Sequence, residues 1–154
     1  MTDLVIRAAE QADLPALLEL YRHLIPDDAR CPDDKATDIL ERLRTFEGSA
    51  VLIGLLRDDL AASCTVIVIP NLTRGGMPYA LIENVVTAPG HRNRGLGKAI
   101  LKAALDRAWA AGCYKAMLMT GSKKPSTLAF YEAAGFEQSK TGFQARRLPV
   151  RAEP

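Results

Sequence analysis

The stretch from residue 80 to residue 111 constrains the fold more than any other part of this 154-residue chain. Residues 80–87 are mostly aliphatic and β-branched, which is typical of a buried strand. The strand is expected to end by Pro89, because proline cannot donate to a β-ladder. From Leu96 onward, apolar residues recur at the spacing of one helical face until Gly112 provides a stop. The sequence therefore predicts a strand, a short turn and a helix in direct succession.

The turn between these elements, residues 91–98, is predicted to bind an anion. Gly95 and Gly97 would let the backbone approach a ligand closely, and the first N–H groups of a helix have no intrahelical partner. Positive charge comes from three side chains, Arg92, Arg94 and Lys98. A phosphate or pyrophosphate group suits this combination.

Two other phosphate-binding motifs do not fit this turn. Gly90 and Gly95 have the spacing of a P-loop, but Leu96 and Gly97 stand where that motif needs Lys and Ser or Thr. Gly95-Leu96-Gly97 begins like a dinucleotide fingerprint, but Ile100 stands where the third glycine is needed. The P-loop and Rossmann interpretations are therefore disfavoured.

The remaining pattern, Arg92-x-x-Gly95-x-Gly97 after a strand, resembles motif A of the GNAT acyltransferase superfamily, whose loop holds the pyrophosphate of acyl-coenzyme A. Residues 112–115, Gly-Cys-Tyr-Lys, and residues 130–136, which resemble motif B, follow at the spacing of that family. Residues 82–86, Ile-Glu-Asn-Val-Val, and the Gly-Cys-Tyr-Lys segment look most like the glucosamine-6-phosphate N-acetyltransferases. The resemblance covers roughly residues 81–136 and leaves out the N-terminal third, which shapes the substrate site.

The hydrophobic periodicity predicts a mixed α/β chain, with helices flanking a central sheet that the resemblance implies is mostly antiparallel. The expected order, β-α-α-β-β-β-α-β-α-β-β, matches the GNAT order. Expected strands cover residues 4–7, 50–57, 60–69, 80–87, 115–120, 136–139 and 143–147. Expected helices cover residues 14–24, 33–46, 96–111 and 127–134. The length predicts one domain over residues 1–148, a GNAT domain by the resemblance, with a frayed C-terminal tail over residues 149–154.

Composition excludes several classes of partner. A formal net charge of +2 is too small to indicate nucleic acid or an anionic membrane as a partner. No apolar run approaches the about 20 residues needed to span a bilayer. The three cysteines lack metal-type spacing and predict free thiols, no metal and a cytoplasmic location. The resemblance also makes a homodimer plausible.

The resemblance implies acetyl-coenzyme A as the co-substrate. Backbone N–H groups of residues 94–98 would hold the pyrophosphate, and the strand end at residues 85–87 would contact the pantetheine and polarise the thioester carbonyl. Ser126 would bond to the cofactor or simply cap the next helix. The cofactor-binding residues expected on this basis are Val85, Val86, Thr87, Arg92, Asn93, Arg94, Gly95, Leu96, Gly97, Lys98, Ser126 and Tyr131.

Three residues are candidates for the chemistry. Tyr131 aligns with the family tyrosine that protonates the coenzyme A thiolate, although a half-buried tyrosine bonded for packing is the alternative. Glu83 and Asn84 are polar residues inside an apolar strand, where an unpaired polar group would be costly, so each needs a partner. Glu83 is expected to act as a general base through water or to bind the acceptor, and its alternative is an ion pair with an arginine of a neighbouring strand. Asn84 would bind substrate, but the glucosamine-phosphate enzymes have an acidic residue at its position.

The function that follows is transfer of an acetyl group to a primary amine of a small molecule by direct attack. An amino sugar or its phosphate is the first choice of acceptor. Protein or peptide amines are an alternative, and a non-catalytic coenzyme A-binding regulatory module is another. Residues 70–78 form a long irregular connection that either covers the acceptor site or only joins two strands.

Overall fold

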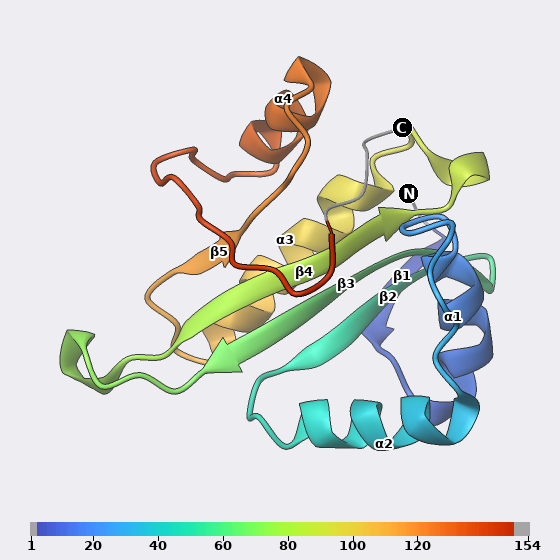
Figure 1. Ribbon diagram of the computed structural model, residues 1–154, viewed down its shortest axis with the longest axis horizontal. Coiled ribbons are helices and arrows are strands. Elements are labelled where there is room, and N and C mark those ends of the chain that lie inside the picture. The colour runs from blue at the N-terminus through green and yellow to red at the C-terminus, as the bar shows by residue number, and fades with distance from the viewer. Residues whose placement is uncertain (1–2, 150–154) are drawn as a thin grey trace. The chain divides into compact units, whose positions relative to one another are not determined.

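The computed structural model describes residues 3–149. The chain divides into two compact units, and the boundary between them in the sequence falls between Leu118 and Met119. The first unit is built on a five-stranded sheet in the order β1-β2-β3-β4-β5 (Figure 1). Neighbouring strands are antiparallel except β4 and β5, which run parallel. The strands are β1 Leu4–Ala8, β2 Ala50–Leu56, β3 Asp59–Ile69, β4 Tyr79–Thr87 and β5 Ala116–Leu118. The expected mixed α/β fold with a mostly antiparallel sheet is confirmed.

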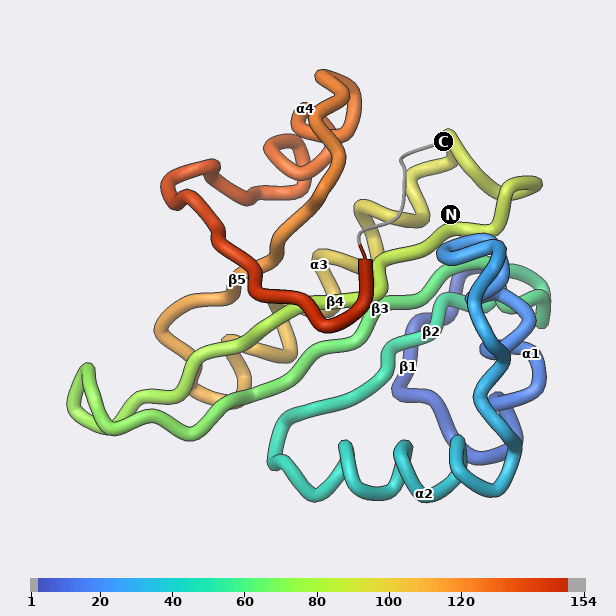
Figure 2. The backbone as a smooth tube through the Cα atoms, in the orientation of Figure 1, coloured from blue at the N-terminus to red at the C-terminus, as the bar shows by residue number. Residues whose placement is uncertain are grey.

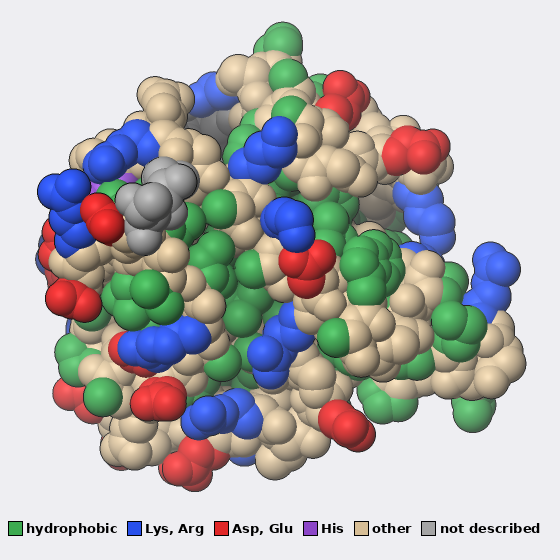
Figure 3. Space-filling model, turned by 180° about the vertical axis from the view of Figure 1, so that it is seen from behind, with side chains coloured by type: hydrophobic (Ala, Val, Ile, Leu, Met, Phe, Trp, Pro, Cys, Tyr) green, Lys and Arg blue, Asp and Glu red, His purple; other side chains and the backbone are tan. Residues whose placement is uncertain are grey.

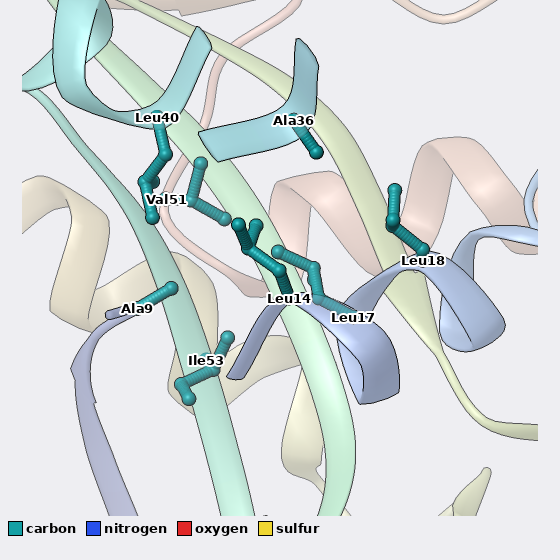
Figure 4. Packing of buried hydrophobic residues seen from close by; sticks show 8 residues of the cluster. All are labelled: Ala9, Leu14, Leu17, Leu18, Ala36, Leu40, Val51 and Ile53. Atoms are coloured by element: carbon teal, nitrogen blue, oxygen red, sulfur yellow. The ribbon is translucent and has the colours of Figure 1, made fainter. Parts of the chain in front are cut away.

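Helices cover both faces of this sheet. The helices of the first unit are α1 Leu14–Tyr21, α2 Asp33–Arg44 and α3 Leu96–Ala110. Leu17 and Leu40, from α1 and α2, pack with Val51 and Ile53 of β2 (Figure 4). The opposite face of the sheet meets α3, where the Cys64 thiol lies 4.0 Å from the backbone oxygen of Ile100.

Local sequence explains where these elements begin and end. Asp13 precedes α1, and its carboxylate accepts hydrogen bonds from the Arg7 guanidinium at 2.7 and 2.9 Å and from the Glu10 N–H. Arg57 and Asp58 join β2 to β3 with positive φ values of 49° and 69°, as a tight hairpin turn of type I′ requires. The chain path through this hairpin and into β4 is visible in Figure 2.

The second unit contains α4, Pro125–Ala133, followed by irregular chain. The two strands expected at residues 136–139 and 143–147 are absent, and that prediction is wrong. An isolated hairpin is marginal in water unless it buries an apolar face. Phe143, the large apolar residue of the second expected strand, is 91% exposed. Residues 150–154 of the expected tail lie outside the described residues, and a single domain over residues 1–148 stays a prediction.

Charges of both signs are mixed over the surface that Figure 3 shows, where Lys and Arg side chains alternate with Asp and Glu. None of the helices within residues 3–149 combines the length and apolar character that crossing a membrane requires.

Candidate active site

The centre of the candidate site is a β-bulge in β4. Glu83 pairs with Thr65 and Val86 pairs with Ser63, so two residues of β4, Asn84 and Val85, stand opposite the single residue between Ser63 and Thr65. Asn84 has a positive φ of 54°. Asparagine is one of the few non-glycine residues that tolerate this left-handed conformation. Bulges of this kind redirect side chains and are frequent beside active sites.

The bulge changes how Glu83 and Asn84 must be understood. Both side chains are exposed, so the expectation that each needs a buried partner is wrong. Within residues 3–149 no ion pair joins Glu83 to an arginine, so the structural alternative for this residue is not observed there. The bulge explains the asparagine at position 84, because the backbone there adopts a left-handed conformation that asparagine tolerates.

One edge of β4 is open beside the bulge. β5 pairs with Ala80, Leu81 and Ile82 and ends at Leu118, whereas β4 continues to Thr87. The part of β4 from Glu83 to Thr87 therefore has no strand partner on the β5 side within the described sheet. Val86 is buried, and Val85 and Thr87 are half-buried. Free main-chain groups along such an edge can pair with an extended ligand.

The turn after β4 presents a run of free N–H groups. Asn93 and Gly95 adopt left-handed conformations with φ values of 59° and 77°, and Gly95 directly precedes α3. Residues 93–98 donate no backbone hydrogen bond to any described residue; the first N–H to bond back in α3 is that of Ala99, to the Gly95 oxygen at 3.0 Å. Consecutive N–H groups that include left-handed residues at a helix N-terminus form an anion-binding concavity.

Basic side chains surround this run. The Arg92 Nε donates to the Thr87 oxygen at 3.3 Å, and the Arg94 Nη1 lies 3.3 Å from the His91 Nδ1. Lys98 is exposed in the first turn of α3. The ion pairs of the described residues include none of the three cations, so all three charges remain available to an anion. Together with the N–H run, these groups fit a pyrophosphate.

The other predicted residues, Tyr131 and Ser126, belong to α4 in the second unit. Tyr131 is half-buried, and its ring lies edge-on to Phe130 and Phe136 with centroid distances of 5.0 and 6.4 Å. Ser126 is exposed and does not cap α4, because Lys124 is the capping residue and Pro125 occupies the first turn. Proline begins a helix well because its φ is already helical, and α4 therefore starts two residues earlier than expected.

Sequence reasoning missed a polar cluster on the sheet face that meets α1. The Tyr21 side chain, at the end of α1, lies beside the hydroxyl side chains of Thr65 and Ser63. Burial raises the pKa of Tyr21, and the neighbouring Thr65 and Ser63 hydroxyls oppose that shift. The signal in the sequence was the i, i+2 spacing of two hydroxyl residues within the apolar strand β3, which places both on one face.

The connection at residues 70–78 joins β3 to β4. It leads into Tyr79, at the opposite end of β4 from the anion-binding turn, and a hollow of about 410 Å³ there is lined partly by Pro70, Asn71 and Pro78. Two residues from the end of α3, Ala110 and Ala111, also line it. The fifteen-residue helix α3 alone separates this hollow from the anion-binding turn by about 22 Å. Whether residues 70–78 cover the acceptor site or only join two strands stays a prediction.

Comparison with known proteins identifies the family. Residues 14–136 match the model of the acetyltransferase (GNAT) family. Glucosamine 6-phosphate N-acetyltransferase of Trypanosoma brucei brucei is 32% identical over 136 residues, which are 88% of this chain and 90% of that protein. An L-methionine sulfoximine/L-methionine sulfone acetyltransferase of Salmonella typhimurium is 25% identical over 139 residues, covering 86% of this chain and 80% of that protein.

A solved structure gives the same result. A protein of Agrobacterium tumefaciens str. C58, provisionally described as an acetyltransferase, superposes with a TM-score of 0.86 at 42% identity. The match covers 93% of this chain and 99% of that one. The chain belongs to the acetyltransferase (GNAT) family and is an acyl-coenzyme A-dependent N-acetyltransferase.

Proposed function

We propose that this enzyme transfers an acetyl group from acetyl-coenzyme A to the primary amine of a small molecule by direct attack, without a covalent enzyme intermediate. The observation that carries this proposal is the continuity of residues 83–98. An exposed carboxylate at the bulge of β4 is followed, on the same segment, by an open strand edge and a run of free N–H groups. One strand and the turn that follows it would thus position both the cofactor-binding groups and the base.

The cofactor would be held by the chain's own main-chain and basic groups. The N–H groups of residues 94–98, with Asn93, Arg92, Arg94 and Lys98, would bind the pyrophosphate. The edge at Val85, Val86 and Thr87 would pair with the pantetheine amides, and one of its N–H groups would stabilise negative charge on the carbonyl oxygen. Acetyl-coenzyme A would supply the activated acetyl group as a thioester.

Two side chains would handle protons. Glu83 is exposed and has no ion pair among the described residues, so its carboxylate is available to take a proton from the amine, directly or through water, or to bind that amine. Tyr131 would give a proton to the departing sulfur, as the family resemblance implies. Asn84 would shape the bulge and contact the acceptor through its amide, and Ser126 would contact the cofactor.

A small amine, such as an amino sugar or its phosphate, is the proposed acceptor. The Trypanosoma brucei brucei relative is a glucosamine 6-phosphate N-acetyltransferase, which supports this class. The Salmonella typhimurium relative acts on amino-acid derivatives, so a free amino acid is the nearest second choice. Enclosure of the acceptor site by residues 70–78 would favour a small amine, and an open site would favour a protein amine. A cytoplasmic location, a homodimer and the absence of a metal or nucleic-acid partner stay predictions.

Calorimetric titration with acetyl-coenzyme A, followed by a thiol-release assay on a panel of amines, tests the proposal. The panel contains glucosamine 6-phosphate, L-methionine sulfone, polyamines and short peptides. Binding with release on one small amine is the expected result. Binding without release on any amine would leave the regulatory module instead, and absence of binding would overturn the assignment of residues 92–98.

A matched pair of variants tests the proton donor. Tyr131→Phe is expected to slow transfer while acetyl-coenzyme A affinity changes little, because only the hydroxyl is lost. Tyr79→Phe makes the same change at the far end of β4 and should leave the rate intact. Equal rates for the two variants would remove Tyr131 from the mechanism.

A further inference from the structure

Exposed apolar side chains gather around the hollow at the far end of α3. The described part of the first unit exposes six large apolar side chains, of which Val5 lies in β1 and Ile39 in α2. Each of the other four is the neighbour in sequence of a residue that lines the hollow. These four are Phe46, Leu72, Met77 and Trp109. Leu72 is 98% exposed, and apolar side chains that gather around a concavity mark an interaction surface.

The hollow is preformed, because one side chain holds the loop that borders it. The Asn71 amide donates to the Thr73 backbone oxygen at 3.3 Å, to the Thr73 Oγ1 at 2.9 Å and to the Met77 oxygen at 3.1 Å. This loop lies at the end of the β3–β4 hairpin in Figure 1. Most residues that line the hollow are apolar, namely Val68, Pro70, Pro78, Ala110 and Ala111. A hollow of this kind accepts an apolar side chain of a binding partner without rearrangement.

Two cations share one aromatic ring at the Pro78 side of the hollow. The Tyr114 N–H donates to the Pro78 oxygen at 3.0 Å, which places Tyr114 beside the lining. The Arg74 Cζ lies 5.2 Å from the centroid of the Tyr114 ring, and the Lys115 Nζ lies 5.4 Å from the same centroid. Neither cation has an ion pair with a carboxylate of the described residues. A ring attracts a cation but does not neutralise it, so these two charges favour a partner that supplies carboxylates.

The opposite side of the hollow carries charges of both signs. A Cβ added to Gly48 would lie 2.8 Å from the Ala111 Cβ, which places Gly48 against the lining. The Arg107 Nε donates to the Gly48 oxygen at 2.7 Å, and Glu47 supplies an exposed carboxylate that lines the hollow. Three cations, Arg74, Arg107 and Lys115, therefore surround a hollow that contains one acid, and the balance of charge is positive.

We propose that this surface binds a peptide segment of a protein partner that carries both apolar side chains and carboxylates. An apolar side chain would enter the hollow and contact Leu72 and Met77, while carboxylates would pair with Arg74 and Lys115. Charge complementarity selects an acidic partner, and exposed aromatic, methionine and arginine side chains are typical of interfaces. The surface belongs entirely to the first unit and lies at the opposite end of α3 from the anion-binding turn, so this interaction goes beyond acetyl transfer.

Trp109 makes the interaction measurable, because it is the only tryptophan of the chain and borders the hollow. The probes are two amphipathic peptides of the same pattern without aromatic residues, one built of leucine and glutamate and the other of leucine and lysine. The acidic peptide is expected to shift the Trp109 emission to shorter wavelength in a saturable manner. Calorimetric titration without acetyl-coenzyme A should show that the basic peptide binds at least about tenfold more weakly.

Matched variants test the two halves of the recognition. Lys115→Gln should weaken binding of the acidic peptide several-fold, whereas Lys35→Gln, which removes an exposed cation from α2, should leave it unchanged. Leu72→Ser should also weaken binding, whereas Val5→Ser, which changes an exposed apolar residue of β1, should not. Thermal unfolding of all four variants measures any structural cost of the substitutions.

Several outcomes would overturn the proposal. Equal affinity for the acidic and basic peptides would exclude charge selection, and binding of neither peptide would exclude the surface as a peptide site. Equal effects of Lys115→Gln and Lys35→Gln, or of Leu72→Ser and Val5→Ser, would place binding elsewhere. If sedimentation showed that wild type self-associates and that Leu72→Ser does not, the occupant would be a second copy of the chain. Peptide binding is measured without an amine or acetyl-coenzyme A, so its failure would leave the proposed function intact.

Discussion

Glu83 lies directly opposite Thr65 across the antiparallel β3–β4 pair, one residue before β4 bulges at Asn84. The alternation of side chains between the two faces is regular up to this pair and is lost immediately after it. The Glu83 carboxylate, the Thr65 hydroxyl and the open edge of β4 therefore occur together at the bulge, where the regular strand geometry ends. The sheet provides a rigid base for the pair, and the bulge provides the opening beside it.

Replacing Glu83 with Gln should reduce kcat/KM for the amine by about 100-fold or more, the usual contribution of a general base. Steady-state kinetics measure this loss, and calorimetry should show unchanged acetyl-coenzyme A affinity because the carboxylate lies outside the anion-binding turn. Glu47→Gln is the matched control, since Glu47 is an exposed acid that lines the hollow near the far end of α3. A mere rise in KM with normal kcat would make Glu83 a substrate ligand rather than a base.

Substitutions at Asn84 should follow backbone conformation rather than side-chain chemistry. Asn84→Gly is expected to keep the free energy of unfolding close to wild type, because glycine adopts a φ of 54° without strain. Asn84→Val should cost about 1–2 kcal/mol and lower activity, since a β-branched residue is strained there and the bulge would shift. Chemical denaturation compares the two. If valine were as stable as glycine, the bulge would not depend on this residue.

The sequence predicted the glycine turn and the helix start after β4, but it did not predict the backbone geometry around Glu83. The glycines and arginines of residues 91–98 can be interpreted from the sequence alone, because the N–H groups that bind an anion at a helix N-terminus belong to the same short segment. The bulge at Asn84 is not local, since it depends on how β3 and β4 pair. The sequence alone does not show this pairing register, so it predicts that Glu83 and Asn84 are buried and need partners. Both side chains are in fact exposed.

The distinction between features set by neighbouring residues and features set by distant packing also explains where the other sequence predictions differ from the structure. Ser63 and Thr65 could be placed on one face of a strand from their spacing, but the approach of Tyr21 depends on how α1 packs on the sheet. The hairpin expected at residues 136–147 is absent because alternation over four or five residues forms a stable strand only where one of its faces is buried. Residues 70–78 join the end of β4 that lies away from the anion-binding turn, which their position in the sequence already indicates.

Gly95 and Gly75 offer a matched test of the anion-binding turn. Both have positive φ, 77° and 67°, so valine at either position should cost about 1–2 kcal/mol in the free energy of unfolding. Only Gly95→Val should weaken acetyl-coenzyme A binding, because a side chain there would distort the run of N–H groups. Gly75 lies in the connection before β4, and a Cβ added to it would meet no heavy atom within 4 Å, so its variant isolates the cost of strain. Equal loss of binding in both would mean that stability, and not the turn, controls affinity.

Buried thiols should make the protein less stable at alkaline pH. Burial raises the pKa of Cys64 to about 12, and it also raises the pKa of Cys113. An unfolded thiol loses its proton near pH 8.5, so above that pH the folded state holds a proton that the unfolded state has released. The free energy of unfolding therefore falls as pH rises, and for Cys64 the fall is up to about 1.4 kcal/mol per pH unit until its folded pKa is reached.

Cys64→Ala measures this contribution. The variant should be less stable than wild type at pH 7 because it leaves a small cavity beside α3. Between pH 8 and pH 10, however, its free energy of unfolding should fall by about 2 kcal/mol less than that of wild type, since one thiol no longer titrates in the unfolded state. Urea denaturation across that range gives both slopes. Parallel slopes would show that the Cys64 thiol ionises in the folded protein as readily as in the unfolded chain, and that its burial does not hold the proton.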